Sequence, residues 1–136
     1  MRLDIHPFNN LADAIAWAGA TIDGGAARAR GRHISHTHGQ EHAYLAKTHD
    51  AVAYRNAGFP EDGRKFPWVS EEAKHSGRTL REVALAIIDK GTVWWDTTAP
   101  AIEGLRVGAK ARIAKASTIP EAVRLARQYE SMLNEI

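Results

Sequence analysis

The chain has 136 residues, which fits one domain, or at most a small domain with an extended arm. Apolar residues make up 44% of it and charged residues 25%, values that are ordinary for a soluble globular protein and exclude a fully disordered one. The sequence has no cysteine, which excludes a disulfide scaffold, a thiol nucleophile, a zinc site with Cys ligands and an iron–sulfur cluster.

The formal net charge is +2, and acidic and basic residues are mixed throughout the chain. Two local clusters are basic: Arg28, Arg30 and Arg32 form one, and Arg106, Lys110, Arg112 and Lys115 form the other. A nucleic-acid-binding protein usually carries a basic stripe, and a platform for single strands also has interleaved aromatic residues, which both clusters lack. We therefore expect no nucleic-acid partner and interpret the clusters as solvated surface.

Membrane insertion and secretion are not expected either. The most apolar run, residues 11–20, contains Asp13 and is far shorter than the roughly 20 residues that a transmembrane helix needs. The first residues lack the basic start and apolar stretch of a secretory signal. We expect a soluble protein made in a cytoplasm, without a membrane partner.

The N-terminal residues 1–10 are predicted to form an extended arm. Leu3 and Ile5 alternate with polar residues, a period of two that stops at Pro7. Such a segment is either an edge strand or an arm that pairs with a neighbouring protein. The remainder, 11–136, is predicted to be one helical domain.

Helical periodicity begins after Asn10, a good N-cap, and predicts a helix over 11–32. Gly24 and Gly25 weaken this helix by about 1 kcal/mol each and could break it. A connector without periodicity, 33–39, precedes a second predicted helix over 40–57, which ends at Gly58. A loop over 58–67 and a short helix over 71–76 follow.

The strongest helix signal starts at Thr79, which forms a capping box with Glu82. An apolar face then continues to Ile113, interrupted by Pro100, so the helix over 79–116 is either kinked or split there. If it is continuous, it is about 55 Å long at about 1.5 Å per residue, longer than a compact domain of this size. A last helix, through residue 134, begins with the capping box of Thr118 and Glu121.

We therefore predict a mainly α protein: a helical bundle with one long helix, kinked or split, and an extended N-terminal arm. The far end of the long helix must pack on something outside the compact part, which indicates self-association or a partner. Trp94 and Trp95 are adjacent and point about 100° apart on a helix, so we place Trp94 in the core and Trp95 on a second surface. The candidate interface residues are Leu3, Ile5, Phe8, Trp17, Trp95 and Leu105.

Five of the seven histidines lie between His33 and His49. His36 and His38 lie on the same side of an extended segment, with His33 and His42 nearby in the sequence, and imidazoles bind zinc, nickel or iron. In a threefold assembly, three copies of the pair would supply six ligands. The alternative is a solvated connector with incidental histidines, which we favour because no carboxylate stands at a ligand spacing. We expect no cofactor, with a metal at His36 and His38 as the exception to test.

Signals for catalysis are weak. Ser35, a neighbouring histidine and Asp50 are the residue types of a catalytic triad. We do not expect them to form one, because the sequence around Ser35 does not resemble the strained turn that presents a nucleophilic serine. The Gly24–Gly25 pair lacks the rest of a phosphate-binding loop. Glu71 and Glu72 start a short helix, where interaction with the helix dipole explains them. We do not expect an enzyme.

A series of short motifs runs from about residue 20 to residue 116. In order, they are Arg28, Arg30 and Arg32 at the end of a helix, Gly39-Gln40, Tyr44 and Lys47, Phe66-Pro67, Glu71-Glu72, Gly77-Arg78-Thr79, Trp94 or Trp95, and Ile102-Glu103-Gly104-Leu105-Arg106. This order resembles a helical module of small proteins from the tail and tail-fibre region of tailed bacteriophages and prophages. The chain departs from the module in its histidines at 33, 36, 38 and 42, in Pro100, and in residues 1–19, which have no counterpart.

The resemblance implies a non-enzymatic structural subunit of a phage tail, near the baseplate or the fibre attachment. Its partners would be other virion tail proteins and further copies of itself. It would be found in the virion tail, and in the host cytoplasm during assembly. Two alternatives stay open: a tail-fibre assembly chaperone that is absent from the mature virion, and a DNA-contacting head–tail connector protein that uses the two basic clusters.

Overall fold

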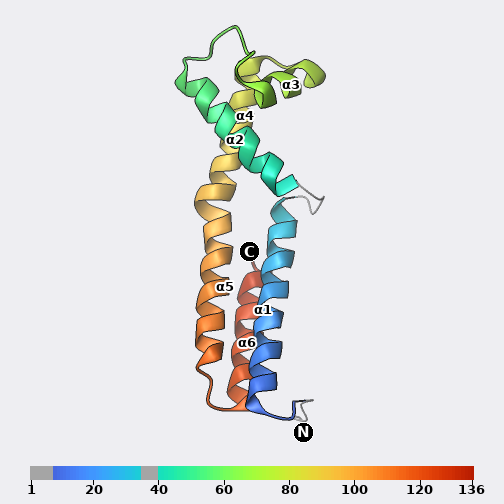
Figure 1. Ribbon diagram of the computed structural model, residues 1–136, viewed down its shortest axis with the longest axis vertical. Helices are drawn as coiled ribbons and strands as arrows, with labels where there is room; N and C mark the ends of the chain where they lie inside the picture. Colours follow the sequence, from blue (N-terminus) through green and yellow to red (C-terminus); the bar gives the residue numbers. More distant parts are fainter. Residues whose placement is uncertain (1–7, 35–39) are drawn as a thin grey trace. The chain divides into compact units, whose positions relative to one another are not determined.

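The structure is a computed structural model that describes residues 8–34 and 40–136 (Figure 1). These residues form helices and connecting loops, and no strand occurs among them. In chain order the elements are α1 (Leu11–His33), α2 (Gln40–Asn56), α3 (Pro67–Ser76), α4 (Leu80–Val93), the π-helical η1 (Trp94–Thr98), α5 (Ala99–Ala114) and α6 (Ile119–Asn134). The prediction of a mainly α protein is confirmed. Most of the predicted arm, including Leu3 and Ile5, lies outside the described residues.

Side-chain caps define three helix starts as the sequence predicts. The Asn10 carboxamide oxygen accepts a hydrogen bond from the Asp13 backbone N–H at 2.9 Å. Thr79 and Glu82 form both hydrogen bonds of a capping box, at 3.1 and 3.0 Å. Thr118 accepts from the Glu121 N–H at 3.2 Å, but the Glu121 carboxylate accepts from the Ser117 N–H at 2.7 Å, so the second predicted capping box forms only one of its two hydrogen bonds.

Helix α3 begins four residues earlier than predicted. Pro67 occupies the first helical position, where its missing N–H has no intrahelical partner to lose. The Asp50 carboxylate, from α2, accepts from the Val69 N–H at 2.9 Å and so satisfies one donor of this helix start. The helix ends at Gly77, whose φ of 71° is the left-handed conformation that glycine adopts without strain.

Contacts among the helices divide the described residues into two compact units. Unit 1 holds the residues up to His33 together with Ala99–Ile136, and unit 2 holds Ile34–Thr98. The chain passes from unit 2 to unit 1 where η1 meets α5, next to Pro100. The domain boundaries 1–10 and 11–136 stay predictions.

Unit 1 is a three-helix bundle in which α5 runs antiparallel to α1 and α6 (Figure 1). Small residues line much of its core and allow the helices to approach closely. A Cβ atom on Gly25 would lie 3.2 Å from Leu133 Cδ1 of α6, so this glycine serves helix packing, and α1 continues through the glycine pair unbroken. The fully buried large side chains of this unit are Ile22, Ile102, Ile113 and Leu133.

Unit 2 packs α2 and α3 against α4. Its core is a cluster around Tyr54, whose ring meets the edges of Phe59 and Phe66 at centroid distances of 5.8 and 5.2 Å. The Tyr54 hydroxyl donates to the Pro60 carbonyl oxygen at 2.7 Å, which fixes the loop after α2. The buried members of the cluster are Ala51, Tyr54, Val69, Ala73, Val83, Ala84 and Ile87.

The predicted long helix consists of three consecutive helical segments, α4, η1 and α5, from Leu80 to Ala114. A single π-helical turn, Trp94–Thr98, lies just before Pro100. Proline cannot donate to the fourth carbonyl before it, and a wider turn is one way in which a helix accommodates this loss. The irregularity before Pro100 is thus a π-helical turn, and a kink or a split of the helix at Pro100 stays a prediction.

Candidate functional site

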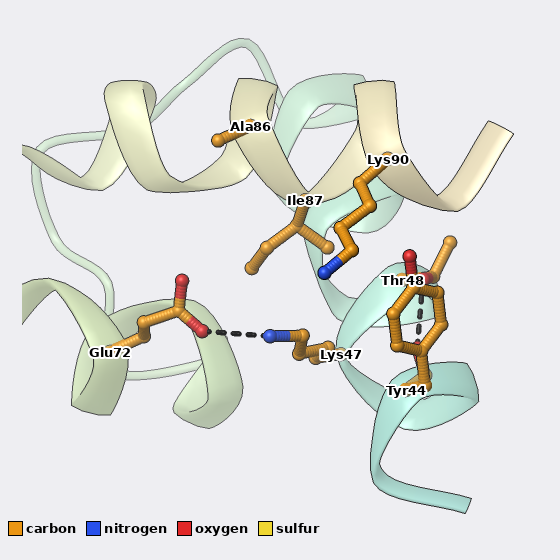
Figure 2. A pocket seen from close by; sticks show the side chains of 7 residues that line it. All are labelled: Tyr44, Lys47, Thr48, Glu72, Ala86, Ile87 and Lys90. Carbon is orange, nitrogen blue, oxygen red and sulfur yellow. Dashed lines mark hydrogen bonds and ion pairs between the residues drawn. The ribbon is translucent and has the colours of Figure 1, made fainter. Parts of the chain in front are cut away.

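A pocket of about 190 Å³ opens in unit 2 where α2, α3 and α4 meet (Figure 2). Ile87 and Ala86 of α4 form its apolar side. The polar lining side chains are Tyr44, Lys47 and Thr48 from α2, Glu72 from α3 and Lys90 from α4. The pocket therefore combines charged groups from three helices over an apolar wall.

Two ammonium groups and one carboxylate set the charge of this pocket. Lys47 Nζ lies 3.0 Å from Glu72 Oε1, and both side chains are partly exposed. Lys90 Nζ lies 5.7 Å from the centre of the Tyr44 ring, a cation–π contact, and pairs with no carboxylate among the described residues. Figure 2 shows both lysine side chains directed into the space between the helices.

Tyr44 is 95% buried, but its hydroxyl has no hydrogen-bond partner among the described residues. Burial raises the pKa of this phenol, so the hydroxyl remains a proton donor at neutral pH. Thr48 donates its hydroxyl hydrogen to the Tyr44 carbonyl oxygen at 2.8 Å. The phenol of Tyr44 is thus the free donor of the pocket wall.

A wider groove of about 580 Å³ shares Lys47 and Glu72 with the pocket. Trp68, at the start of α3, lines this groove and is 45% exposed. Its other lining residues are Gln40, Ala43, Pro67, Glu71 and His75. An exposed tryptophan in a groove is unusual, because this side chain is typical of the central anchors of protein interfaces.

The predicted interface residues lie in varied surroundings. Trp17 is half-buried, packs against Phe8 at a centroid distance of 5.3 Å, and has the Arg127 guanidinium 5.0 Å from its ring centre. Leu105 is half-buried on α5. The interface roles of Phe8, Trp17 and Leu105 stay predictions.

The adjacent tryptophans differ in burial, as the sequence predicts. Trp94 is 3% exposed and belongs to the core of its unit. Trp95 is partly buried, with its ring centre 6.4 Å from that of Tyr44, and its buried Nε1 has no hydrogen-bond partner among the described residues. The interface role of Trp95 stays a prediction.

The predicted metal ligands His36 and His38 lie outside the described residues. Of their neighbours, His33 Nε2 lies 2.9 Å from the Ile136 carbonyl oxygen, and His42 is exposed on the first turns of α2. Residues 8–34 and 40–136 contain no group of three or more side chains that could hold a metal ion. The metal site at His36 and His38 stays a prediction.

Most residues of the two basic clusters form contacts within unit 1. From the first cluster, Arg28 pairs with Glu130 at 3.1 Å and Arg30 with Glu103 at 2.8 Å, and Arg32 donates to the Leu133 carbonyl oxygen. From the second, Arg106 pairs with both Asp23 and Glu103, and Lys110 pairs with Asp23. The clusters therefore form partly exposed ion pairs between α1 and its neighbours α5 and α6, and such pairs contribute modestly to stability.

The pKa values of the two acidic partners reflect these contacts. A hydrogen bond from Lys110 lowers the pKa of Asp23, and Arg106 lowers it further. Arg106 likewise lowers the pKa of Glu103, while the two carboxylates raise the pKa of Arg106. Each group is therefore stabilised in its charged form.

No catalytic triad of Ser35, a histidine and Asp50 is found among the described residues. Asp50 caps α3, as its bond to Val69 shows, and Ser35 lies outside the described residues. Sequence reasoning did not identify Glu72 and Lys90 as residues of a pocket. In the sequence, Glu72 is only one of an acidic pair, and Lys90 is only a lysine near the end of a helix. Tyr44 and Lys47 belong to the motif series. Their proximity to α4 depends on how the helices of unit 2 pack, which the sequence does not show.

None of the helices in the described ranges is both long and apolar enough to cross a bilayer. Comparison of the chain with family models, with curated proteins and with solved structures found no match.

Proposed function

We propose that the chain is a non-enzymatic structural subunit of a bacteriophage tail, in the baseplate or the fibre-attachment region. It acts by helix packing, through its long helical stretch with the irregularity before Pro100, and by an extended N-terminal arm that contacts a neighbouring tail protein or another copy. The tail assignment rests on the series of motifs between about residues 20 and 116.

The exposed Trp68 in its groove is the observation that supports a role in protein association most directly. Tryptophan has the largest apolar surface of any side chain, and burying the exposed 45% of Trp68 against a partner contributes about 2–3 kcal/mol at about 25 cal/mol per Å². Further large apolar side chains are exposed on the described surface: Leu45, Leu85, Val93, Val107 and Met132. These residues are scattered over several helices, which is ordinary for a protein surface, so the support for a role in association comes from Trp68.

The pairing of the basic clusters favours this proposal over a DNA-contacting connector protein. Lysine and arginine side chains bind a phosphate backbone by neutralising its phosphates, which releases the cations condensed on the DNA. Arg30, Arg106 and Lys110 instead contact carboxylates of their own unit at 2.8 to 3.1 Å. Binding to DNA would have to compete with these contacts.

Site-specific photo-crosslinking tests the proposal. A photoreactive phenylalanine analogue replaces Trp68 in cells that produce the phage particles, and the crosslinked products are identified by mass spectrometry. We expect a product with a second tail protein or with another copy of this chain. Lys74 is exposed on the same helix and outside the groove, so its replacement is the matched control. Equal products from both positions, or none, contradict the proposal.

A further inference from the structure

We propose that the unit 2 pocket binds a carboxylate group between Lys47, Lys90 and the hydroxyl of Tyr44. This site goes beyond the tail role and does not depend on it. The carboxylate comes either from an acidic residue of a partner polypeptide or from a small free carboxylic acid.

The charges of the pocket call for one negative group. Lys47 and Lys90 contribute two positive charges, and Glu72 contributes one negative charge. Two ammonium groups directed into one small space repel each other, and a bound anion removes that repulsion. Lys47 already contacts Glu72 at 3.0 Å, whereas Lys90 has no carboxylate partner in the described part of the chain. One positive charge therefore remains uncompensated.

The available hydrogen-bond donors also suit an anion. An ammonium group has three donors, so Lys47 can hold Glu72 and a second carboxylate at the same time. Lys90 offers its donors from α4, on the opposite side of the pocket (Figure 2). The Tyr44 hydroxyl supplies a further donor from a side chain that is 95% buried, which makes it a fixed rather than a mobile partner.

A monoanion fits better than a phosphate. A phosphate carries about −1.5 to −2 charges at pH 7, more than the single uncompensated positive charge can balance. Its second charge would also face Glu72. The volume of about 190 Å³ admits a carboxylate with the first carbons of its chain, which then lie against Ile87. It is smaller than the pockets of about 300 Å³ or more that enclose whole organic ligands.

The shared Lys47 and Glu72 connect this pocket to the groove that holds Trp68. An acidic side chain of a bound polypeptide can therefore enter the pocket while its neighbours lie along the groove. A free carboxylic acid would occupy the pocket alone. The two sources predict different affinities, because only the polypeptide contacts both surfaces.

Titration of the isotope-labelled full-length chain, followed by NMR, tests the site. The probes are acetate, succinate, inorganic phosphate, and a blocked acidic peptide alongside its Asn/Gln counterpart. We expect saturable shifts of the Tyr44, Lys47 and Lys90 signals with a carboxylate probe, and weaker binding of phosphate. Tighter binding of the acidic peptide than of acetate and succinate identifies a polypeptide carboxylate, and equal or tighter binding of the free acids identifies a small ligand.

Substitutions of single side chains show whether the pocket residues do the binding. Lys90→Gln removes one charge from an exposed position and should weaken carboxylate binding about tenfold. Tyr44→Phe removes only the hydroxyl and should weaken it by a smaller factor. Lys74→Gln is the matched control, because it makes the same change of charge outside the pocket, and it should have almost no effect. The site is refuted if no carboxylate probe shifts these signals, if phosphate binds more tightly, if the Asn/Gln peptide binds as well as the acidic one, or if Lys74→Gln weakens binding as much as Lys90→Gln.

Discussion

The contact between α2 and α4 depends on a glycine. A Cβ atom added at Gly91 would lie 2.8 Å from both Cγ2 and Oγ1 of Thr48. Ordinary carbon contacts are about 3.5–4.0 Å, so Gly91→Ala requires a movement of about 1 Å. Thr48 cannot rotate away freely, because it is β-branched and its hydroxyl donates to the Tyr44 carbonyl oxygen at 2.8 Å.

Two opposing effects determine the size of the change. Overpacking a close contact costs about 1–3 kcal/mol, whereas Ala in place of Gly within a helix stabilises it by about 1 kcal/mol. We therefore expect Gly91→Ala to lower the free energy of unfolding by up to about 2 kcal/mol. The assay is urea unfolding followed by circular dichroism.

The control is Gly108→Ala, on the exposed side of α5, where no atom lies within 4 Å of the added Cβ. This change should raise the free energy of unfolding by about 0.5–1 kcal/mol. Thr48→Ala removes the two nearest atoms, so combining it with Gly91→Ala should recover about 1–2 kcal/mol relative to the sum of the single changes. The reasoning is refuted if Gly91→Ala stabilises the protein as much as Gly108→Ala does.

Three further predictions concern the pH response, a helix cap and the exposed tryptophan. Lys110 lowers the pKa of Asp23 in the folded state. The stability that the charged Asp23 carboxylate contributes is therefore present above about pH 4 and is lost as the pH falls further. Asp23→Asn should flatten the acid side of a pH–stability curve by a few tenths of a kcal/mol, since the pair is partly exposed; an unchanged curve contradicts this. Asp50→Ala leaves the Val69 N–H without its acceptor and should cost about 1 kcal/mol in thermal unfolding, whereas a neutral result removes the capping role. Trp68→Ser should lower the free energy of unfolding by at most about 3 kcal/mol, because about half of this side chain is buried in the fold, and a larger loss would show that the side chain supports the fold rather than a partner.

Local signals account for the parts of the fold that the sequence predicts well. Asn10, Thr79 and Thr118 bond to backbone groups three residues away, so their roles depend on neighbours along the chain. The sequence does not indicate the start of α3 at Pro67, because one of the N–H donors there is satisfied by Asp50, a residue of another helix. The glycines of α1 illustrate the same limit, since a close approach to Leu133 explains Gly25 better than helix propensity does.

The candidate site could be predicted only in part. Tyr44 and Lys47 are one helical turn apart and appear in the motif series, but Glu72 and Lys90 come from helices farther along the chain. Their meeting depends on how α3 and α4 pack on α2, which periodicity does not specify. The basic residues show a second limit of sequence interpretation. In the sequence, Arg30 and Lys110 are indistinguishable from unpaired surface charges, whereas in the fold they pair with Glu103 and Asp23.

Quantitative mass spectrometry of purified particles tests the central proposal most directly. Tail and head fractions from a culture that produces this chain are separated, and the copies per particle are counted against a labelled standard. A structural tail subunit predicts a fixed number of copies that purifies with the tail. Recovery of the chain only outside the particles, or in the head fraction with the DNA, contradicts the proposal and favours the assembly chaperone or the connector protein, respectively.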